Sequence, residues 1–302
     1  MQRLLLALAI KYILFCSGYL WADNANVPPE AQQKLQAIYK TVESKLKQDS
    51  DSYQTANLEQ SNRLKIGTLG DQWEPATYMV QPNDSDKGAL VGVWTDGLRF
   101  RSVLNISLHR LIEDNEIIQQ VPQLSVEQAI DRAERYLNHY QIPISKKLKL
   151  VNATFNTGVT PGCWAFTWDR VIDGYSWDDI CLPVGEGVSV VFHETKGLVS
   201  VGSTIYTPLP KSLDVVMTRE QAIAKATRCA PLVERTPFYK SCRFDGFVVS
   251  GMTSCELKIA VPNYLLDPKR ANWMPTRPPD GTRLCWVVRF TTVDSIDLCI
   301  LH

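Results

Sequence analysis

Residues 163–203 read CWAFTWDRVIDGYSWDDICLPVGEGVSVVFHETKGLVSVGS, and this stretch decides the fold. Trp164, Phe166 and Trp168 alternate with Ala165, Thr167 and Asp169, which is the period of a strand with one buried face. Asp173-Gly174 is a strong reversal signal, and Gly197 suits the left-handed conformation of a second hairpin. We therefore predict a four-stranded antiparallel meander with strands at 163–169, 178–182, 188–192 and 198–201. None of these residues forms a catalytic constellation.

A helical segment of the chain is repeated. SVEQAIDRAER at 125–135 recurs as TREQAIAKATR at 218–228, with the apolar, small and charged positions matched. Both copies open with a capping box, Ser125 with Gln128 and Thr218 with Gln221, which predicts a helix start at each place. The small alanines on one face of each predicted helix allow close approach to a sheet.

The strand half of the pattern is repeated as well. LCWVVRF at 284–290 matches GCWAFTW at 162–168, and DLCI at 297–300 matches DICL at 179–182. The two cysteines lie 18 residues apart in the first copy and 14 apart in the second. Because the difference is even, the in/out alternation of both strands is preserved, which favours a common strand pairing.

These patterns predict an α+β fold of repeated units, each with one capped helix packed on an antiparallel β-meander (PepSY/cystatin-like). In these motifs the chain resembles the PepSY-like family, particularly the tandem repeats of secreted bacterial proteins. The units are expected at 121–207 and 214–302, and the second contains an insertion and stops before the final hairpin. The resemblance implies non-catalytic modules, found in propeptides of secreted metallopeptidases and proposed to restrain peptidases. It transfers no functional residue, because the motif is structural.

The second unit is expected to leave one sheet edge open. We predict that strands from Leu90–Ile106 cover this edge within the chain, and strand addition by a partner is the alternative.

The N-terminal region has three predicted parts. Residues 1–22 carry Arg3 and an apolar run, which indicates an export signal and an extracytoplasmic location (secreted, periplasmic or cell envelope); an uncleaved membrane anchor is the alternative. Residues 27–62 are expected to form an amphipathic helix, with Leu35, Ile38, Val42 and Leu46 on one face, and a linker. Residues 63–120 form a β-rich segment with strand-like runs at 77–80, 90–94, 98–106 and 109–112.

Composition and motifs exclude several classes of function. The formal net charge is zero and no basic run is interleaved with aromatics, which argues against nucleic-acid binding, although a local basic patch is still compatible with it. His193-Glu194 begins like a zinc-protease helix, but the second His is absent and the stretch lies between strands. We predict no metal, cofactor or catalytic residue. Asp178 and Asp179 point to opposite faces if they lie on a strand, so they are interpreted as solvated acids.

Seven cysteines follow the predicted signal, and outside the cytoplasm thiols tend to pair. Recurrence in both copies predicts the disulfides Cys163–Cys181 and Cys285–Cys299. A two-residue turn at 173–174 places Cys163 opposite Val184, so the first bond requires a bulge or a wider loop. Bonds between the copies are the alternative. The remaining three cysteines, Cys229, Cys242 and Cys255, share one bond and one leftover thiol.

The function expected from these observations is that of an exported PepSY-like protein that binds or restrains a secreted peptidase or another envelope protein. A structural component of the envelope or spore surface and an unrecognised extracytoplasmic hydrolase are the alternatives. Trp164, Trp168 and Trp286 are interpreted as core residues, whereas Trp273, among prolines, is the candidate for surface contact. Sequons at Asn83, Asn105 and Asn152 matter if the host glycosylates.

Overall fold

The structure is a computed structural model that describes residues 27–50, 53, 64–69, 77–82, 87–113, 121–142, 144, 147–157, 160–177, 187–203, 205, 210, 213–215, 217–233, 249–260, 283–292 and 297–301. The contacts divide the chain into two compact units. Unit 1 comprises Met1–Asp71, Pro75–Trp168 and Gly187–Thr204. Unit 2 comprises Gln72–Glu74, Asp169–Glu186 and Ile205–His302.

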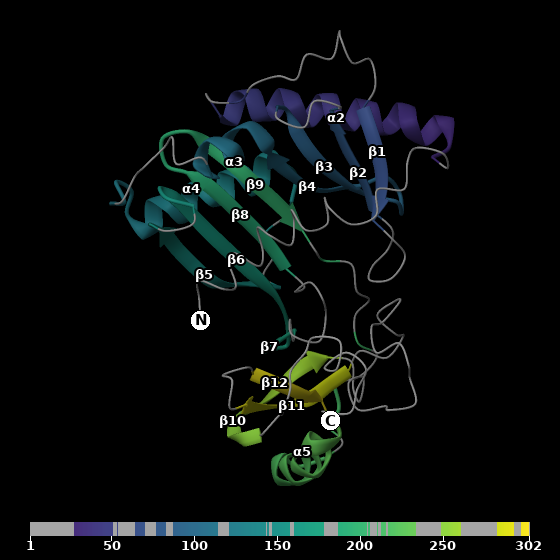
Figure 1. The fold of residues 1–302 in the computed structure, drawn as a ribbon, viewed down its shortest axis with the longest axis vertical. Helices are drawn as coiled ribbons and strands as arrows, with labels where there is room; N and C mark the ends of the chain where they lie inside the picture. Colours follow the sequence, from purple (N-terminus) through teal and green to yellow (C-terminus); the bar gives the residue numbers. More distant parts are fainter. Residues whose placement is uncertain are drawn as a thin grey trace. The chain divides into compact units, whose positions relative to one another are not determined.

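Unit 1 is built on one large sheet with the strand order β1-β2-β3-β4-β9-β8-β6-β5 (Figure 1). Its strands are β1 (Leu64–Leu69), β2 (Thr77–Pro82), β3 (Ala89–Trp94), β4 (Phe100–Asn105), β5 (Leu148–Asn156), β6 (Cys163–Ile172), β8 (Gly187–His193) and β9 (Gly197–Ser203). Strands β6, β8 and β9 confirm three of the four predicted strands of the 163–203 stretch. The fourth, at 178–182, lies outside the described residues.

The N-terminal β-rich segment belongs to this same sheet. Strand β4 pairs antiparallel with β9, and Val103 lies opposite Val201. Strand β3 pairs with β2 and β4. The prediction that Leu90–Ile106 covers the open edge of the second unit is therefore wrong, because both of its strands are taken up by the sheet of unit 1.

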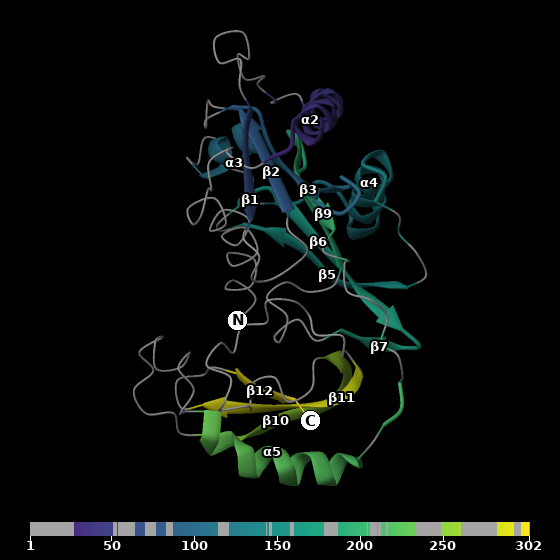
Figure 2. The ribbon, with the colours of Figure 1, turned by 90° about the vertical axis from the view of Figure 1, so that its right-hand side faces the viewer.

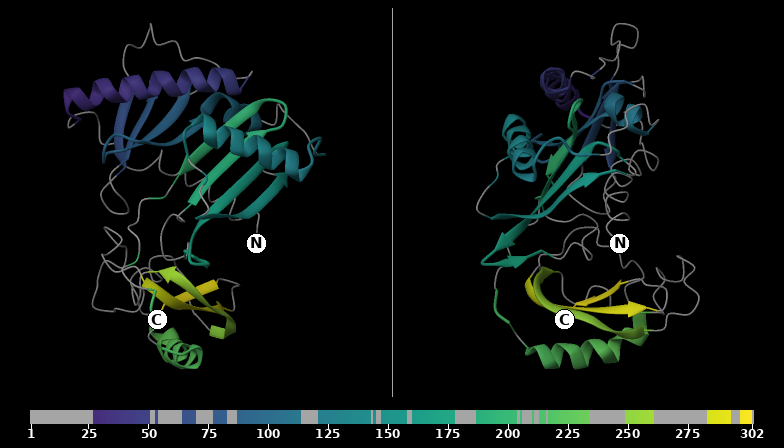
Figure 3. Two further views of the ribbon diagram at one scale, coloured as in Figure 1. Left: turned by 180° about the vertical axis from the view of Figure 1, so that it is seen from behind. Right: turned by 90° about the vertical axis from the view of Figure 1, so that its left-hand side faces the viewer.

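Helices cover both faces of the unit 1 sheet. Helices α2 (Pro29–Asp49) and α4 (Val126–His139) lie on one face, and α3 (Ile106–Glu113) lies on the other (Figures 2 and 3). On the α3 side, Leu108 and Ile112 form a core with β-strand residues that include Cys163, Ala165, Val191 and Val199. On the α4 side, the rings of Tyr136 and Phe192 lie 5.6 Å apart, and those of Phe166 and Phe192 lie 6.0 Å apart.

Strand β6 is buried on both faces at its start. Trp164, Phe166 and Trp168 are buried as predicted, but Cys163 and Ala165 are also buried, at 0% and 2% exposure. The prediction of one buried face for this strand was wrong, because helix α3 covers the second face of the sheet and the sequence pattern did not predict that helix.

Helix α3 occupies residues that the sequence pattern assigned to a strand at 109–112. Asn105 starts the helix by accepting a hydrogen bond from the Leu108 amide at 3.1 Å. Its side-chain nitrogen donates to Leu198 O at 3.2 Å, and Asn105 is fully buried. The sequon at Asn105 is therefore part of the core, and an i, i+4 pair, Leu108 and Ile112, faces the sheet.

Helix α2 confirms the predicted N-terminal helix. Leu35, Val42 and Leu46 are buried as expected, whereas Ile38 is half-buried. Tyr39 is fully buried, and its hydroxyl accepts a hydrogen bond from the Ala89 amide at 3.4 Å. Burial raises the pKa of Tyr39 to about 12.

Unit 2 contains α5 (Arg219–Val233) and a sheet of order β10-β11-β12, with strands Val249–Ala260, Arg283–Thr292 and Asp297–Leu301. Ala222 and Ala226 of α5 are fully buried. A second hairpin of this unit joins the end of β6 to β7 (Tyr175–Ser176), with Ile172 opposite Tyr175. Asp173 and Gly174 both have positive φ, so the predicted two-residue turn is confirmed.

Both predicted capping boxes are present. The Gln128 amide donates to Ser125 Oγ at 3.2 Å, and the Gln221 amide donates to Thr218 Oγ1 at 3.3 Å. The fold is thus a mixture of helices and antiparallel sheet, as predicted. The finer arrangement, a repeated helix on a meander, stays a prediction, because the two sheets differ in extent and 178–182 is not described. No helix in the described ranges is long and apolar enough to cross a membrane.

Candidate functional site

The turn between β8 and β9, His193–Gly197, connects the sheet to the residues that precede α4. Glu194 is 6% exposed, and its carboxylate accepts hydrogen bonds from the amides of Gln123, at 2.9 and 3.1 Å, and Leu124, at 3.0 Å. It also accepts from Trp164 Nε1 at 2.7 Å. The carboxylate therefore fixes the chain just before α4 begins.

The neighbouring His193 is also buried in this turn. Burial is the largest cause that lowers the pKa of His193, so the imidazole is neutral near pH 7. Its Nδ1 accepts a hydrogen bond from the Thr195 amide at 3.3 Å. Within the described parts of the chain, no group of three or more His, Cys, Asp or Glu side chains is placed to hold a metal ion.

A cleft of about 620 Å³ lies beside α4 in unit 1. One wall is a face of α4 with Gln128, Arg132, Arg135 and His139, which follow one another at spacings of four, three and four residues. The turn residues Thr195–Gly197 and the C-terminal end of α2, with Gln48 and Asp49, also line the cleft. This volume is in the range of ligand-binding clefts.

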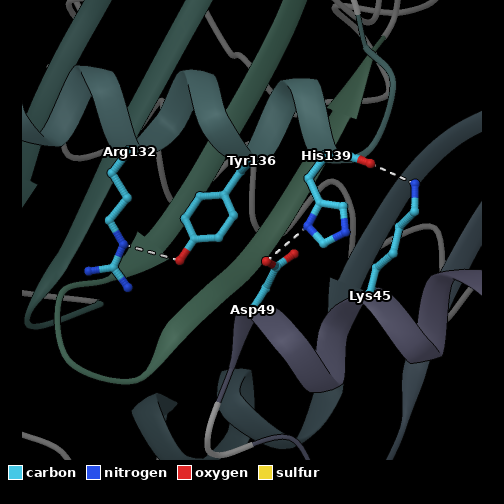
Figure 4. A network of polar contacts seen from close by, with 5 residues as sticks. All are labelled: Lys45, Asp49, Arg132, Tyr136 and His139. Carbon is cyan, nitrogen blue, oxygen red and sulfur yellow. Dashed lines mark hydrogen bonds and ion pairs between the residues drawn. The ribbon is translucent and has the colours of Figure 1, made fainter.

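Arg132 is held in place by three contacts in this cleft. Its Nε donates to Tyr136 Oη at 3.2 Å, and one terminal nitrogen donates to Glu194 O at 2.5 Å. The guanidinium also lies 5.0 Å from the centre of the Phe192 ring. Figure 4 shows Arg132 and Tyr136 side by side on α4. The side chain is therefore ordered before any ligand arrives.

Polar contacts of Lys45, Asp49 and His139 join the ends of α2 and α4 (Figure 4). His139 Nδ1 lies 3.0 Å from Asp49 Oδ1, and Lys45 donates to His139 O at 2.6 Å. Burial raises the pKa of Asp49 above its usual value, and His139 opposes this rise. The Tyr140 hydroxyl lies near the same carboxylate, but without hydrogen-bond geometry.

Gly197 lets the end of α2 dock on the turn. Its φ is +96°, as the predicted hairpin requires. A Cβ at this position would overlap the Asp49 carbonyl oxygen and lie 2.8 Å from Ser50 Cα. Ser50 Oγ donates to Lys196 O at 2.7 Å across the same contact. The sequence indicated the conformation of Gly197 and gave no sign of this close approach.

The predicted disulfide residues are not brought together where the structure describes them. Cys163 is a buried free thiol, and burial raises its pKa to about 12. Its predicted partner, Cys181, lies outside the described residues. Cys299 lies opposite Arg289, four residues along β11 from Cys285, so this register does not support a Cys285–Cys299 bond. The Cys163–Cys181 bond stays a prediction, and the confirmed two-residue turn at 173–174 opposes it.

The other predicted residues divide between core and undescribed segments. Trp164 and Trp168 are each 3% exposed, and Trp286 is half-buried. Trp273, the candidate surface contact, lies outside the described residues, as do Asp178, Asp179 and the export signal at 1–22. The predictions made for them are untested.

Strand β5 is a second candidate surface. It ends the strand order of the unit 1 sheet and is nine residues long. Lys149 and Val151 are exposed, and Val151 has 50% of its surface accessible. Within the described residues no strand lies on its outer side.

Comparison with known proteins adds little about family. No protein-family model and no curated protein matches the chain. Among solved structures, the chain is similar to the Bacillus megaterium YpeB C-terminal domain at 12% identity and a TM-score of 0.35. The match covers 80% of this chain and 90% of that chain. A likeness at this TM-score carries no argument about function, so the PepSY-like resemblance rests on the sequence motifs.

Proposed function

We propose that this protein is an exported, non-catalytic PepSY-like protein that binds a partner protein, a secreted peptidase or another envelope component. The observation that supports the proposal is strand β5 of unit 1, which has no outer neighbour among the strands that the structure describes. An edge strand offers a row of main-chain donors and acceptors to which an extended segment of another protein can add as a further strand.

Strand β5 is long enough for such recognition. Nine residues of extended chain span about 30 Å, which exceeds the length of an average strand. Edge strands are often protected by charge, and β5 carries Lys149. The exposed Val151 stands two residues further on the same face, so an incoming strand would find an apolar side chain to pack against.

Two side chains of unit 1 that could take part in a reaction, Glu194 and Cys163, are used by the fold instead. Glu194 accepts four hydrogen bonds that involve two backbone amides and an indole. Cys163 is buried in the core, and burial raises the pKa of its thiol. Because the thiolate is the form that attacks substrates, this thiol is a poor nucleophile. These roles favour a binding function over a hydrolytic one.

The test is binding of the mature protein to thermolysin-like peptidases, together with crosslinking and pull-down from the native host. Val151→Lys places a second charge on the edge and is expected to weaken partner binding about ten-fold. Val215→Lys is the matched control, because Val215 is exposed to a similar degree, 46%, outside any strand.

Three outcomes would contradict the proposal. If no peptidase binds and no protein is captured, the binding function fails. If Val151→Lys binds as well as the parent protein, the edge strand is not the contact. Turnover of substrates from a hydrolase panel would exclude a non-catalytic role.

A further inference from the structure

The cleft beside α4 carries a local excess of positive charge in a chain whose net charge is zero. Arg132, Arg135 and Lys196 line it, and Asp49 is the single carboxylate residue of the described lining. One oxygen of Asp49 already contacts His139 Nδ1 at 3.0 Å. The electrostatic character of the cleft is therefore set by the three cations.

Arg132 retains donors that face no described acceptor. Its Nε and one terminal nitrogen are used by Tyr136 and Glu194 O, and none of the described residues bonds the second terminal nitrogen. This second terminal nitrogen carries two N–H groups that can donate to a carboxylate, and hydrogen bonds between charged groups are stronger than those between neutral ones. Because Arg132 is already ordered by its contacts, little side-chain entropy is lost when it binds a ligand.

The α4 side of the cleft is elongated, and its two cations, Arg132 and Arg135, lie about one helical turn apart near its middle. Gln128 and His139 are eleven residues apart on the helix, which corresponds to about 16 Å. An extended peptide covers that length with about five residues. Lys196 adds a third cation from the β8–β9 turn, so the positive charge of the cleft comes from two separate elements.

We propose that this cleft binds an acidic peptide segment, with carboxylates at Arg132, Arg135 and Lys196. The cleft walls are polar, so an apolar segment would lose hydration without a matching contact. The proposal goes beyond the proposed function, because the cleft is a site other than the β5 edge. It can fail on its own, because its test needs no natural partner.

The test measures the binding of fluorescein-labelled hexaglutamate to the full chain by fluorescence anisotropy, with hexaglutamine as the uncharged comparison. We expect hexaglutamate to bind at least about ten-fold more tightly, and its binding to weaken as salt is raised. The double variant Arg135→Glu/Lys196→Glu is expected to lose about ten-fold or more in affinity. Both side chains are exposed, so the fold should persist.

The matched control is Lys34→Glu/Lys40→Glu, which changes the net charge equally at two exposed positions of α2 outside the cleft. It is expected to bind hexaglutamate within about two-fold of the parent protein apart from a small non-specific loss. Circular dichroism checks each variant, and Arg135→Gln/Lys196→Gln replaces the cleft variant if that one unfolds. Amide exchange should show added protection in 128–139 and 195–197.

Three results would overturn the proposal. The first is equal binding of hexaglutamine and hexaglutamate. The second is an equal loss of affinity in the cleft variant and the control, which would indicate non-specific attraction. The third is displacement of the peptide by the same concentration of inorganic phosphate, which would make the cleft a small-anion site.

Discussion

The Glu194 carboxylate fixes the place where α4 meets the sheet. The turn that carries it brings the carboxylate under two amides at positions 123 and 124, just before the Ser125 cap, and beside the Trp164 indole. A buried carboxylate is stable when hydrogen bonds satisfy its oxygens, and this one has four such contacts. The residue that looked like part of a metal motif is therefore a structural acceptor.

Replacing Glu194 should destabilise unit 1. Glu194→Ala leaves two amides and the buried Trp164 indole without an acceptor and is expected to cost about 3 kcal/mol of unfolding free energy. Glu194→Gln keeps one acceptor oxygen and should cost about half as much. Urea unfolding monitored by circular dichroism measures both. Glu30→Gln, on the exposed start of α2, is the control and should cost less than about 0.5 kcal/mol. Equal costs for Glu194→Ala and the control would contradict this role.

Cys163 should be unreactive in the folded protein. Its side chain is fully buried, and its pKa is raised to about 12 by burial, so almost no thiolate exists at pH 8. We expect iodoacetamide at pH 8 to leave Cys163 unmodified in the native state and to alkylate it in urea.

Peptide mapping without reductant provides the control for this prediction. A peptide that joins 163 to 181 would restore the disulfide prediction and explain a lack of reaction in urea. Rapid alkylation of native Cys163 would show that the core around it opens.

At the scale of elements, three segments meet at the β8–β9 turn. The end of α2 packs on Gly197, Ser50 donates to Lys196 O, and the Asn105 side chain donates to Ser50 Oγ at 3.3 Å. Each backbone group at the end of α2 needs a partner once the helix ends. The Ser50 carbonyl accepts from the Tyr53 amide at 3.1 Å, and the Ser50 side chain bonds to the turn and to β4. Because α2 ends against Gly197, its position depends on a residue without a side chain at 197.

Gly197→Ala should therefore lower the free energy of unfolding by more than the strain of a positive φ alone would. Its Cβ overlaps the end of α2 and its φ is positive, so we expect a loss of about 3 kcal/mol or more. Gly174→Ala is the matched control, because Gly174 also has a positive φ, +87°, but no atom lies within 4 Å of its added Cβ. It should cost about 1 kcal/mol. Chemical denaturation compares the two, and similar losses would show that the contact with α2 is unimportant.

The two tryptophans at matching positions of the repeated motif, Trp164 and Trp286, each connect a strand to the start of a helix. Trp164 Nε1 reaches the residues before α4 through Glu194, whereas Trp286 Nε1 donates directly to Met217 O, the residue before the α5 cap, at 2.9 Å. The same type of residue thus ties a strand to a helix start in both units, by two different routes.

At the scale of the whole sheet, unit 1 extends beyond the unit that the sequence predicted at 121–207. Strands β1–β4 extend it beyond β9, so β9 and β8 lie inside the sheet and β5 and β1 at its ends. Interior strands exchange their amides through global opening, whereas edge strands exchange through local opening. We expect hydrogen exchange to be slowest in β8, β9 and β4 and fastest in β5 and β1.

Native-state exchange measured by mass spectrometry tests this order. Strand β10 of unit 2, read in the same experiment, shows whether that unit opens separately. Protection of β5 equal to that of β9 in the absence of any partner would contradict its place as an exposed edge.

Local sequence determined the elements that depend on near neighbours. The capping boxes at Ser125 and Thr218, the two-residue turn at Asp173-Gly174, the helix α2 and the aromatic stripe of β6 could all be predicted, because each depends on residues a few positions apart. The 109–112 stretch was predicted to be a strand and is part of helix α3. The cap of this helix, Asn105, accepts from the Leu108 amide and is held by a hydrogen bond to Leu198 O of β9, which local sequence does not indicate.

Tertiary structure alone decided the features that join distant segments. Four features each require residues that lie about 50 or more positions apart in the chain. They are the pairing of β4 with β9, the second buried face of β6, the acceptor role of Glu194 and the cleft beside α4. Periodicity within a segment records which face is apolar, but it does not record which segment covers that face or pairs with its edge. For that reason the sequence by itself determined helices α2, α4 and α5, most of the strands and one buried side of β6. The folded chain decided the second buried side of β6 and where the charges gather.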